Sequence, residues 1–130
     1  MHKQNKYMKI SIITITYNSA KTVQRALDSV QNQHYSDIEH IIVDGASSDG
    51  TREIVEKYAA DHKNVRYISE PDKGIYNALN KGIQMATGDV IGFLHSDDML
   101  YSSDSIGQIA ASFENESVDV VYGDLQYCHG

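Results

Sequence analysis

The sequence alternates four times between a strand-like run and a helix-like run, and this alternation is the feature that most constrains the fold. Strands that alternate with helices favour an α/β fold with a mainly parallel sheet. We therefore predict a three-layer α/β/α arrangement in one domain over residues 1–130, with residues 1–8 as a polar N-terminal extension. The strand-like runs are 9–16, 38–44, 65–69 and 89–94, and a fifth run at 118–122 follows the last helix-like run.

The helix-like run that starts near residue 75 has the clearest amphipathic pattern. Its apolar residues recur at intervals of three and four, which is the spacing of one helix face. We predict that this face is buried and that the helix ends near Thr87 and Gly88. The residues of the face are Ile75, Ala78, Leu79, Ile83 and Ala86.

Length, charge and cysteine content narrow the class of protein. A chain of 130 residues suits one domain, and 18 acidic against 11 basic residues give a net charge of −7. Such a chain lacks the basic surface that nucleic acids attract, so we predict no nucleic-acid partner. The apolar run at 10–16 is too short to span a bilayer, so we expect no transmembrane segment. The single cysteine, Cys128, forms no intrachain disulfide, which favours a reducing, cytoplasmic setting.

Polar residues follow each of the first four strand-like runs. In a parallel sheet the carboxyl ends of the strands share one edge, and ligands bind at that edge. We therefore expect segments 16–18, 44–45, 70–74 and 96–98 to converge, although they are far apart in the sequence.

Ser96, Asp97 and Asp98 come directly after an apolar strand-like run. Two adjacent carboxylates at such a place are costly unless they are solvated, paired or bound to a cation. Mg²⁺ and Mn²⁺ take oxygen ligands of this kind and can bridge the oxygens of a diphosphate. The alternative is that Asp97 or Asp98 caps the next helix.

Asp44 and Tyr17 stand at the ends of two neighbouring strand-like runs. A carboxylate can accept a hydrogen bond from a ring N–H of a nucleobase, and a tyrosine can stack on the base. The alternatives are that Asp44, which precedes Gly45, forms a turn and that Tyr17 lies at the rim of the core.

Asp72, Lys73 and Gly74 lie on a loop that opens a helix. Lys73 could meet a phosphate there, because a helix N-terminus adds a favourable potential for anions. The alternative is an ordinary solvated turn.

Four ordered segments together resemble the N-terminal, nucleotide-sugar-binding part of a family 2 glycosyltransferase with the Rossmann-like GT-A fold. The match extends from about residue 8 to residue 124. The segments are SIITITYN (11–18), IVDGASSDGT (42–51), SEPDKGIYNALNKG (69–82) and ATGDVIGFLHSDD (86–98).

The resemblance implies a UDP-sugar donor, with Thr16, Tyr17 and Asp44 around the base and Asn18 as a further residue that binds the nucleotide sugar. It implies that Asp97 lies near the ribose and that Asp98 binds Mn²⁺ or Mg²⁺. It also implies that the loop of Asp72, Lys73 and Gly74 closes against the donor. Members of the family with this pattern generally invert the anomeric centre. The implied acceptor is a saccharide or lipid-linked molecule, and the implied role is polysaccharide biosynthesis in the cytoplasm or at a membrane surface.

The chain departs from the family pattern at two places. Many relatives have Asp-Asp where this chain has Asp44 and Gly45, so part of the base or ribose contact is missing or is supplied differently. The family's catalytic base and acceptor half lie well downstream, so we expect the base beyond residue 130. The polypeptide is then a fragment, and we expect its exposed apolar surface to favour self-association.

Two other functions stay open at this point. One is a nucleotide-binding module without catalysis, which acts alone or with a partner that supplies the missing half. The other is a nucleotidyltransferase, which also uses a metal and a nucleotide. A basic, glycine-rich loop after the first strand-like run would favour the nucleotidyltransferase, and residues 16–20 are not such a loop.

Overall fold

The structure is a computed structural model that describes residues 8–112. Within these residues it contains one sheet of four parallel strands in the order β3-β2-β1-β4. The predicted α/β fold with a parallel sheet is confirmed, whereas the run predicted as a strand at 118–122 lies outside the described residues. The strands are β1 (Ile10–Thr16), β2 (Ile38–Asp44), β3 (Val65–Ser69) and β4 (Val90–Phe93). The helices are α1 (Val23–Gln31), α2 (Thr51–Asp61), α3 (Ile75–Met85) and α4 (Ser105–Ser112).

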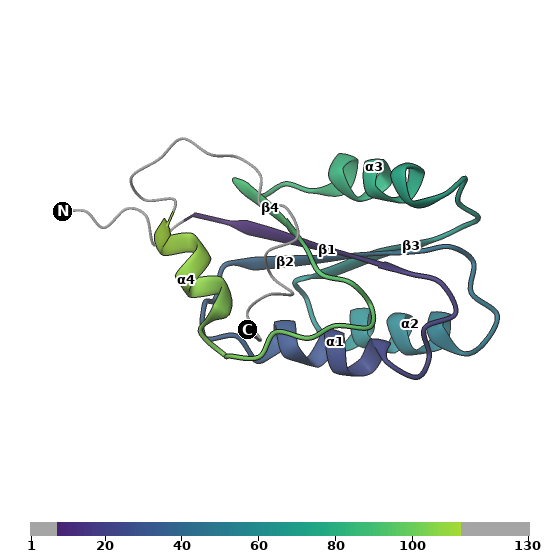
Figure 1. The fold of residues 1–130 in the computed structure, drawn as a ribbon, viewed down its shortest axis with the longest axis horizontal. Coiled ribbons are helices and arrows are strands. Elements are labelled where there is room, and N and C mark those ends of the chain that lie inside the picture. Colours follow the sequence, from purple (N-terminus) through teal and green to yellow (C-terminus); the bar gives the residue numbers. More distant parts are fainter. Residues whose placement is uncertain (1–7, 113–130) are drawn as a thin grey trace.

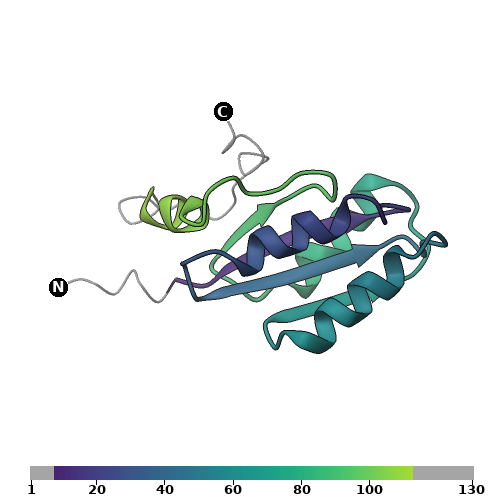
Figure 2. The same ribbon diagram turned by 90° about the horizontal axis from the view of Figure 1, so that it is seen from below.

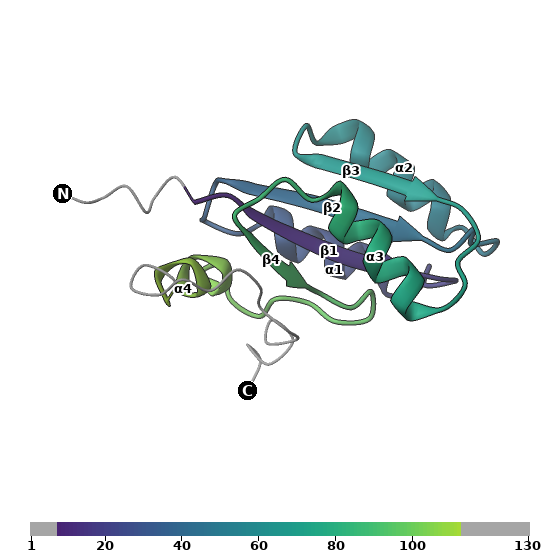
Figure 3. The same cartoon turned by 90° about the horizontal axis from the view of Figure 1, so that it is seen from above.

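Helices cover both faces of the sheet. In Figure 1, α1 and α2 lie on one face and α3 on the other, with α4 near the amino end of the sheet. Figure 2 shows α1 and α2 side by side, and Figure 3 shows α3 running over the opposite face. The three layers follow from the parallel connections, because each helix must cross over the sheet before the next strand can pair.

The central strands are apolar because both of their faces are covered. Every residue of β2 is buried, including three polar residues that have internal partners. Glu39 accepts a hydrogen bond from Ser11 at 2.8 Å and pairs with Arg66 at 2.9 Å. His40 has no exposed surface and lies between the hydroxyls of Thr14 and Tyr58. The third, Asp44, ends β2 at the edge where the polar segments meet.

The buried face of α3 differs from the prediction. Ala78 is buried, but Ile75 and Ile83 are 50% and 43% exposed. The helix docks on β1 through small residues, and a Cβ added to Gly82 would lie 2.6 Å from Cγ2 of Ile13. This close approach puts Ala78 and Gly82 at the centre of the contact and leaves the two isoleucines on its flanks. Leu79 and Ala86 are half-buried, and Ala86 follows the last residue of the helix.

No helix within residues 8–112 is long and apolar enough to cross a membrane.

Candidate functional site

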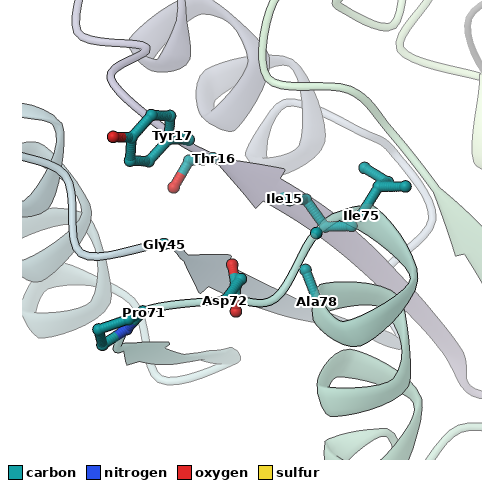
Figure 4. Close-up of a pocket in the computed structure, with 9 residues that line it drawn as sticks. Ile15, Thr16, Tyr17, Gly45, Pro71, Asp72, Ile75 and Ala78 are labelled. Atoms are coloured by element: carbon teal, nitrogen blue, oxygen red, sulfur yellow. The ribbon is translucent and has the colours of Figure 1, made fainter.

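Three of the four segments that were expected to converge line one pocket at the carboxyl edge of the sheet. The pocket has a volume of about 440 Å³, and Figure 4 shows residues from the ends of β1, β2 and β3 around it. Four of the predicted site residues are among its walls: Thr16, Tyr17, Asp72 and Gly74. The other lining residues are Ile15, Gly45, Pro71, Ile75 and Ala78.

Asp44 is buried beneath this pocket edge and is saturated with hydrogen bonds. Its Oδ1 accepts the hydroxyls of Thr16 and Ser47, each at 2.6 Å. Its Oδ2 accepts the amide of Ser47 at 2.9 Å and the hydroxyl of Ser69 at 2.8 Å. Burial raises the pKa of the Asp44 carboxyl, but hydrogen bonds from Ser47, Thr16 and Ser69 outweigh burial and hold that pKa below its ordinary value. Asp44 is therefore ionised at neutral pH and joins the ends of β1, β2 and β3.

Tyr17 and Asn18 have different positions in the loop after β1. Tyr17 lines the pocket with 66% of its surface exposed, so its ring is open to a ligand. Asn18 has a φ of +48° and joins two loops. Its backbone N–H donates a hydrogen bond to Ser47 Oγ at 2.8 Å, and its side-chain Oδ1 accepts one from the backbone N–H of Ser48 at 3.0 Å. Asn18 is not among the lining residues.

The loop before α3 places Asp72 inside the pocket and Lys73 outside it. Lys81 holds the Asp72 carboxylate, with Nζ 2.7 Å from Oδ1, and also pairs with Glu70 at 2.9 Å. Lys73 is exposed, and its amide donates to Asn77 Oδ1 at 3.0 Å. Gly74 has a φ of +113°, a conformation that favours glycine, and it directly precedes the first turn of α3. The first turn of α3 therefore starts at the pocket wall.

The carboxylates after β4 lie beside the first loop but do not line the pocket. Ser96 brings their loop against the β1 loop, because its Oγ is 2.9 Å from Oγ of Ser19. The backbone carbonyl of Asp97 accepts a hydrogen bond from Arg25 Nη2 at 3.5 Å. The backbone N–H of Asp98 donates to the His95 carbonyl at 3.1 Å.

The capping alternative for this carboxylate pair is wrong. The next helix, α4, begins at Ser105, seven positions after Asp98, so neither Asp97 nor Asp98 is at its start. Neither carboxylate accepts a hydrogen bond from residues 8–112. Within the same residues there is no group of three His, Cys, Asp or Glu side chains that could hold a metal ion.

Lys81 is the residue of this site that sequence reasoning missed. A lysine on a helix is usually a solvated side chain, and nothing in its immediate neighbours marks it. The available signal was helical spacing, since Lys81 follows Ala78 by three positions and so shares its side of the helix. That side faces the loop of Glu70 and Asp72.

Comparison with known proteins gives a family match over most of the chain. A family model described as glycosyl transferase family 2 matches residues 11–130. A PGL/p-HBAD biosynthesis glycosyltransferase of Mycobacterium bovis (strain BCG / Pasteur 1173P2) is 39% identical over 117 residues, which is 88% of this chain and 46% of that protein. The chain thus spans about half the length of this curated relative.

Two solved structures resemble the fold closely. The mannosyltransferase PcManGT from Pyrobaculum calidifontis, in complex with GDP-Man and Mn²⁺, superposes with a TM-score of 0.78 at 26% identity, over 88% of this chain and 35% of that one. S. aureus TarS in complex with UDP-GlcNAc superposes with a TM-score of 0.75 at 30% identity, over 83% of this chain and 32% of that one.

Proposed function

The chain belongs to glycosyl transferase family 2, and from this membership we propose that it is the nucleotide-sugar-binding domain of a glycosyltransferase. The proposed reaction of the whole protein transfers a sugar from a UDP-sugar to an acceptor hydroxyl with inversion. The observation that carries the proposal is the pocket at the carboxyl edge of the sheet, where Thr16, Tyr17 and Asp72 meet. The solved neighbours contain GDP-Man or UDP-GlcNAc, which supports a nucleotide sugar as the donor.

The base of the donor is proposed to lie against Tyr17. An exposed aromatic ring at a pocket wall offers a stacking surface, and stacking contributes about 1–3 kcal/mol per base. Asp44 supports this site from below by holding Thr16 and the three strand ends in place. Asn18 supports it by joining the loops after β1 and β2.

The diphosphate of the donor is proposed to lie toward the start of α3. The first amides of a helix lack intrahelical partners and attract anions. Gly74 leads directly into this turn at the pocket wall, and Lys73 is an exposed cation beside it. These features favour a negatively charged group beside the base site, at the start of α3.

Asp97 and Asp98 fit a divalent cation in their chemistry. Both carboxylates are without a hydrogen-bond donor from residues 8–112, and a hard cation takes such oxygens. Mg²⁺ is usually held by one or two carboxylates together with substrate phosphates, so a site without three protein ligands is consistent with it. We propose that Asp98 holds Mn²⁺ or Mg²⁺ and that Asp97 lies near the ribose. The cation would neutralise charge on the departing diphosphate.

The proton-accepting base is proposed to lie outside these 130 residues, as is the site for a saccharide or lipid-linked acceptor. This placement is supported by the extent of the relatives, of which the chain covers between about a third and a half. A role in polysaccharide biosynthesis, in the cytoplasm or at a membrane surface, belongs to the same proposal. A nucleotide-binding module without catalysis would use the same pocket, and an assay for sugar transfer separates the two.

Self-association of this chain is part of the proposal. The flank of α3 carries exposed apolar side chains, with Tyr76 80% exposed beside Ile75 and Ile83. A second copy that covers them would remove this apolar surface from water. Sedimentation velocity should show dimers whose fraction falls in Tyr76→Ser, and a monomer at high concentration would contradict this expectation.

The test of the proposed function is calorimetric titration of UDP into the folded chain, with Mn²⁺ and again with a chelator. We expect binding with Mn²⁺ and its loss with the chelator. Asp98→Ala should behave with Mn²⁺ as the unchanged chain behaves with chelator. Asp61→Ala is the matched control, because Asp61 pairs with Lys57 on α2 and should leave binding unchanged. Absence of binding by the folded chain with UDP or GDP would overturn the proposal.

A further inference from the structure

The carboxylate of Asp72 occupies the space that a side chain on Gly45 would fill. A Cβ built on Gly45 would lie 3.0 Å from Oδ2 of Asp72 and 3.3 Å from Cδ1 of Tyr17. Figure 4 shows Asp72 and Tyr17 on opposite sides of the pocket, with Gly45 at the edge between them. The loop before α3 therefore supplies a carboxylate at the place where the loop after β2 supplies no side chain.

Lys81 fixes the orientation of this carboxylate. Its ammonium contacts Oδ1 of Asp72 at 2.7 Å, and the Pro71 carbonyl at 3.1 Å anchors the same ammonium. The Lys81 side chain is 17% exposed and that of Asp72 is 13% exposed, so the pair is largely shielded from water. Hydrogen bonds to Asp72 and Glu70 raise the pKa of Lys81, so the ammonium stays charged. Oδ2 accepts no hydrogen bond from residues 8–112 and remains available to a ligand.

Among the lining residues within 8–112, Asp72 is the single acid, and both carboxylate oxygens of the neighbouring Asp44 already accept hydrogen bonds. Each oxygen of Asp44 accepts two hydrogen bonds. One of the four comes from the Thr16 hydroxyl, whose proton is therefore not available to a ligand. Among the described lining residues, a ligand that brings an N–H into the pocket therefore meets one side-chain carboxylate, that of Asp72, whose Oδ2 accepts no hydrogen bond from residues 8–112.

We propose that Asp72, positioned by Lys81 in the space left by Gly45, is the residue that selects the nucleobase by accepting its ring N–H. A carboxylate only accepts hydrogen bonds. Uracil and guanine present a ring N–H on their Watson–Crick edge, whereas cytosine and adenine present a ring nitrogen lone pair that repels a carboxylate. Asp72 thus favours UDP or GDP over CDP or ADP. The inference rests on the proposed function and adds the residue that determines which donors enter.

The first test compares the affinity of the chain for UDP and CDP in the same buffer with Mn²⁺. The two nucleotides share ribose and diphosphate, so the ratio of their dissociation constants isolates the base. We expect UDP to bind about tenfold more tightly or better, as for a hydrogen bond to a charged group. In Asp72→Asn the ratio should fall to about one, because the amide also offers a donor. Asp61→Asn, a surface acid on α2, should keep the ratio of the unchanged chain.

The second test separates positioning from folding. Lys81→Met keeps the apolar stem but removes the ammonium, so Asp72 should lose its orientation and the UDP to CDP ratio should fall. Lys81→Arg keeps a cation and should restore much of the ratio. A merely structural role of Lys81 would instead lower thermal stability and both affinities with the ratio unchanged, and that result would overturn the positioning role.

The third test exchanges the source of the carboxylate. Gly45→Asp should weaken UDP binding, because its side chain meets Oδ2 of Asp72 at 3.0 Å. Adding Asp72→Ala should then recover both UDP binding and the preference over CDP. A double variant that binds no better than Gly45→Asp alone would overturn the exchange.

The two proposals fail in different ways. If the folded chain binds no nucleotide, both are wrong. If it binds UDP with Mn²⁺ but Asp72→Asn keeps the full preference over CDP, the proposed function stands and the selection by Asp72 is overturned.

Discussion

Thr16 at the end of β1 donates its hydroxyl to Asp44 at the end of β2, with 2.6 Å between the two oxygens. The two residues are also register partners in the parallel pairing of their strands, and Ser69 pairs with Asp44 from the other side. One ionised side chain thus joins three adjacent strands at the edge where the pocket lies. The edge is held by buried, charge-assisted hydrogen bonds, which are stronger than neutral ones.

Asp44→Asn should destabilise the fold and widen the pocket edge. The hydroxyls of Thr16 and Ser69 and the backbone N–H of Ser47 all donate to the Asp44 carboxylate. The side-chain NH2 of an asparagine would face some of these donors, so at least one of them would lose its acceptor. A buried group left without its partner costs about 1–3 kcal/mol. Urea denaturation should show this loss at neutral pH.

The control for this variant is Asp61→Asn, whose ion pair with Lys57 is exposed and contributes little. Equal midpoints for Asp44→Asn and the unchanged chain would show that Asp44 does not hold the strand ends.

The buried imidazole of His40 makes stability depend on pH. Tyr58 donates its hydroxyl to the Leu27 carbonyl at 3.0 Å, so it accepts from Nδ1–H of His40. Nε2 of His40 is then the acceptor for the Thr14 hydroxyl at 2.8 Å. This arrangement requires a neutral ring, and burial lowers the pKa of His40 from 6.5 to about 3.

The sign of the pH effect follows from that lowered pKa. Between pH 6.5 and about 3 the unfolded chain binds the proton and the folded chain does not. The contribution of His40 to the free energy of unfolding should therefore be complete above pH 6.5. It should decrease as the pH drops, by at most about 1.4 kcal/mol per pH unit.

Thermal unfolding at pH 7, 6 and 5 checks the effect. The fall in melting temperature should be smaller in His40→Gln than in the unchanged chain, while His34→Gln, on the surface, should keep the full fall. Parallel pH profiles for all three proteins would contradict the assignment to His40.

Strand positions could be predicted from the sequence because apolar, β-branched runs end at polar loops. The predicted runs 38–44 and 65–69 coincide with β2 and β3. β1 begins one residue later than predicted, and β4 is one residue shorter than predicted at each end. The α3 face was mispredicted for a physical reason. Helical spacing identifies a broad apolar stripe, but the part of the stripe that meets the sheet depends on how closely Gly82 lets the helix approach Ile13.

The candidate site was predictable in position and less so in detail. The rule that the carboxyl ends of parallel strands share one edge predicts that the segments of Tyr17 and Asp72 converge, and both residues line the same pocket. Whether a carboxylate at that edge is free or saturated depends on its neighbours in space. Asp44 has four donors from three elements, and Asp72 is held by Lys81, nine positions along the chain.

Gly82→Ala should lower stability, because the added methyl has no room. Its Cβ would lie 2.6 Å from Cγ2 of Ile13, so α3 must shift or the isoleucine must leave its rotamer. Overpacking of this kind costs about 1–3 kcal/mol, which exceeds the gain of about 1 kcal/mol in helix propensity. Denaturation midpoints measure the net loss.

Gly107→Ala is the matched variant for this prediction. It also lies inside a helix, α4, but a Cβ there meets no atom of residues 8–112 within 4 Å. It should therefore gain stability from helix propensity alone. If both variants shift the midpoint in the same direction, close packing of α3 on β1 is not what places glycine at position 82.

Tyr17→Ala should weaken nucleotide binding without affecting the fold. The ring is 66% exposed at the pocket wall, so its removal costs little packing, while a stacked base loses about 1–3 kcal/mol. UDP affinity should fall about tenfold, and uridine and UDP should lose similar factors because the lost contact is to the base.

Tyr17→Phe keeps the ring and should bind as the unchanged chain does. Tyr101→Ala removes another exposed tyrosine, 61% exposed and outside this pocket, and should not change the affinity. An affinity that survives Tyr17→Ala would place the base elsewhere along the edge of the sheet.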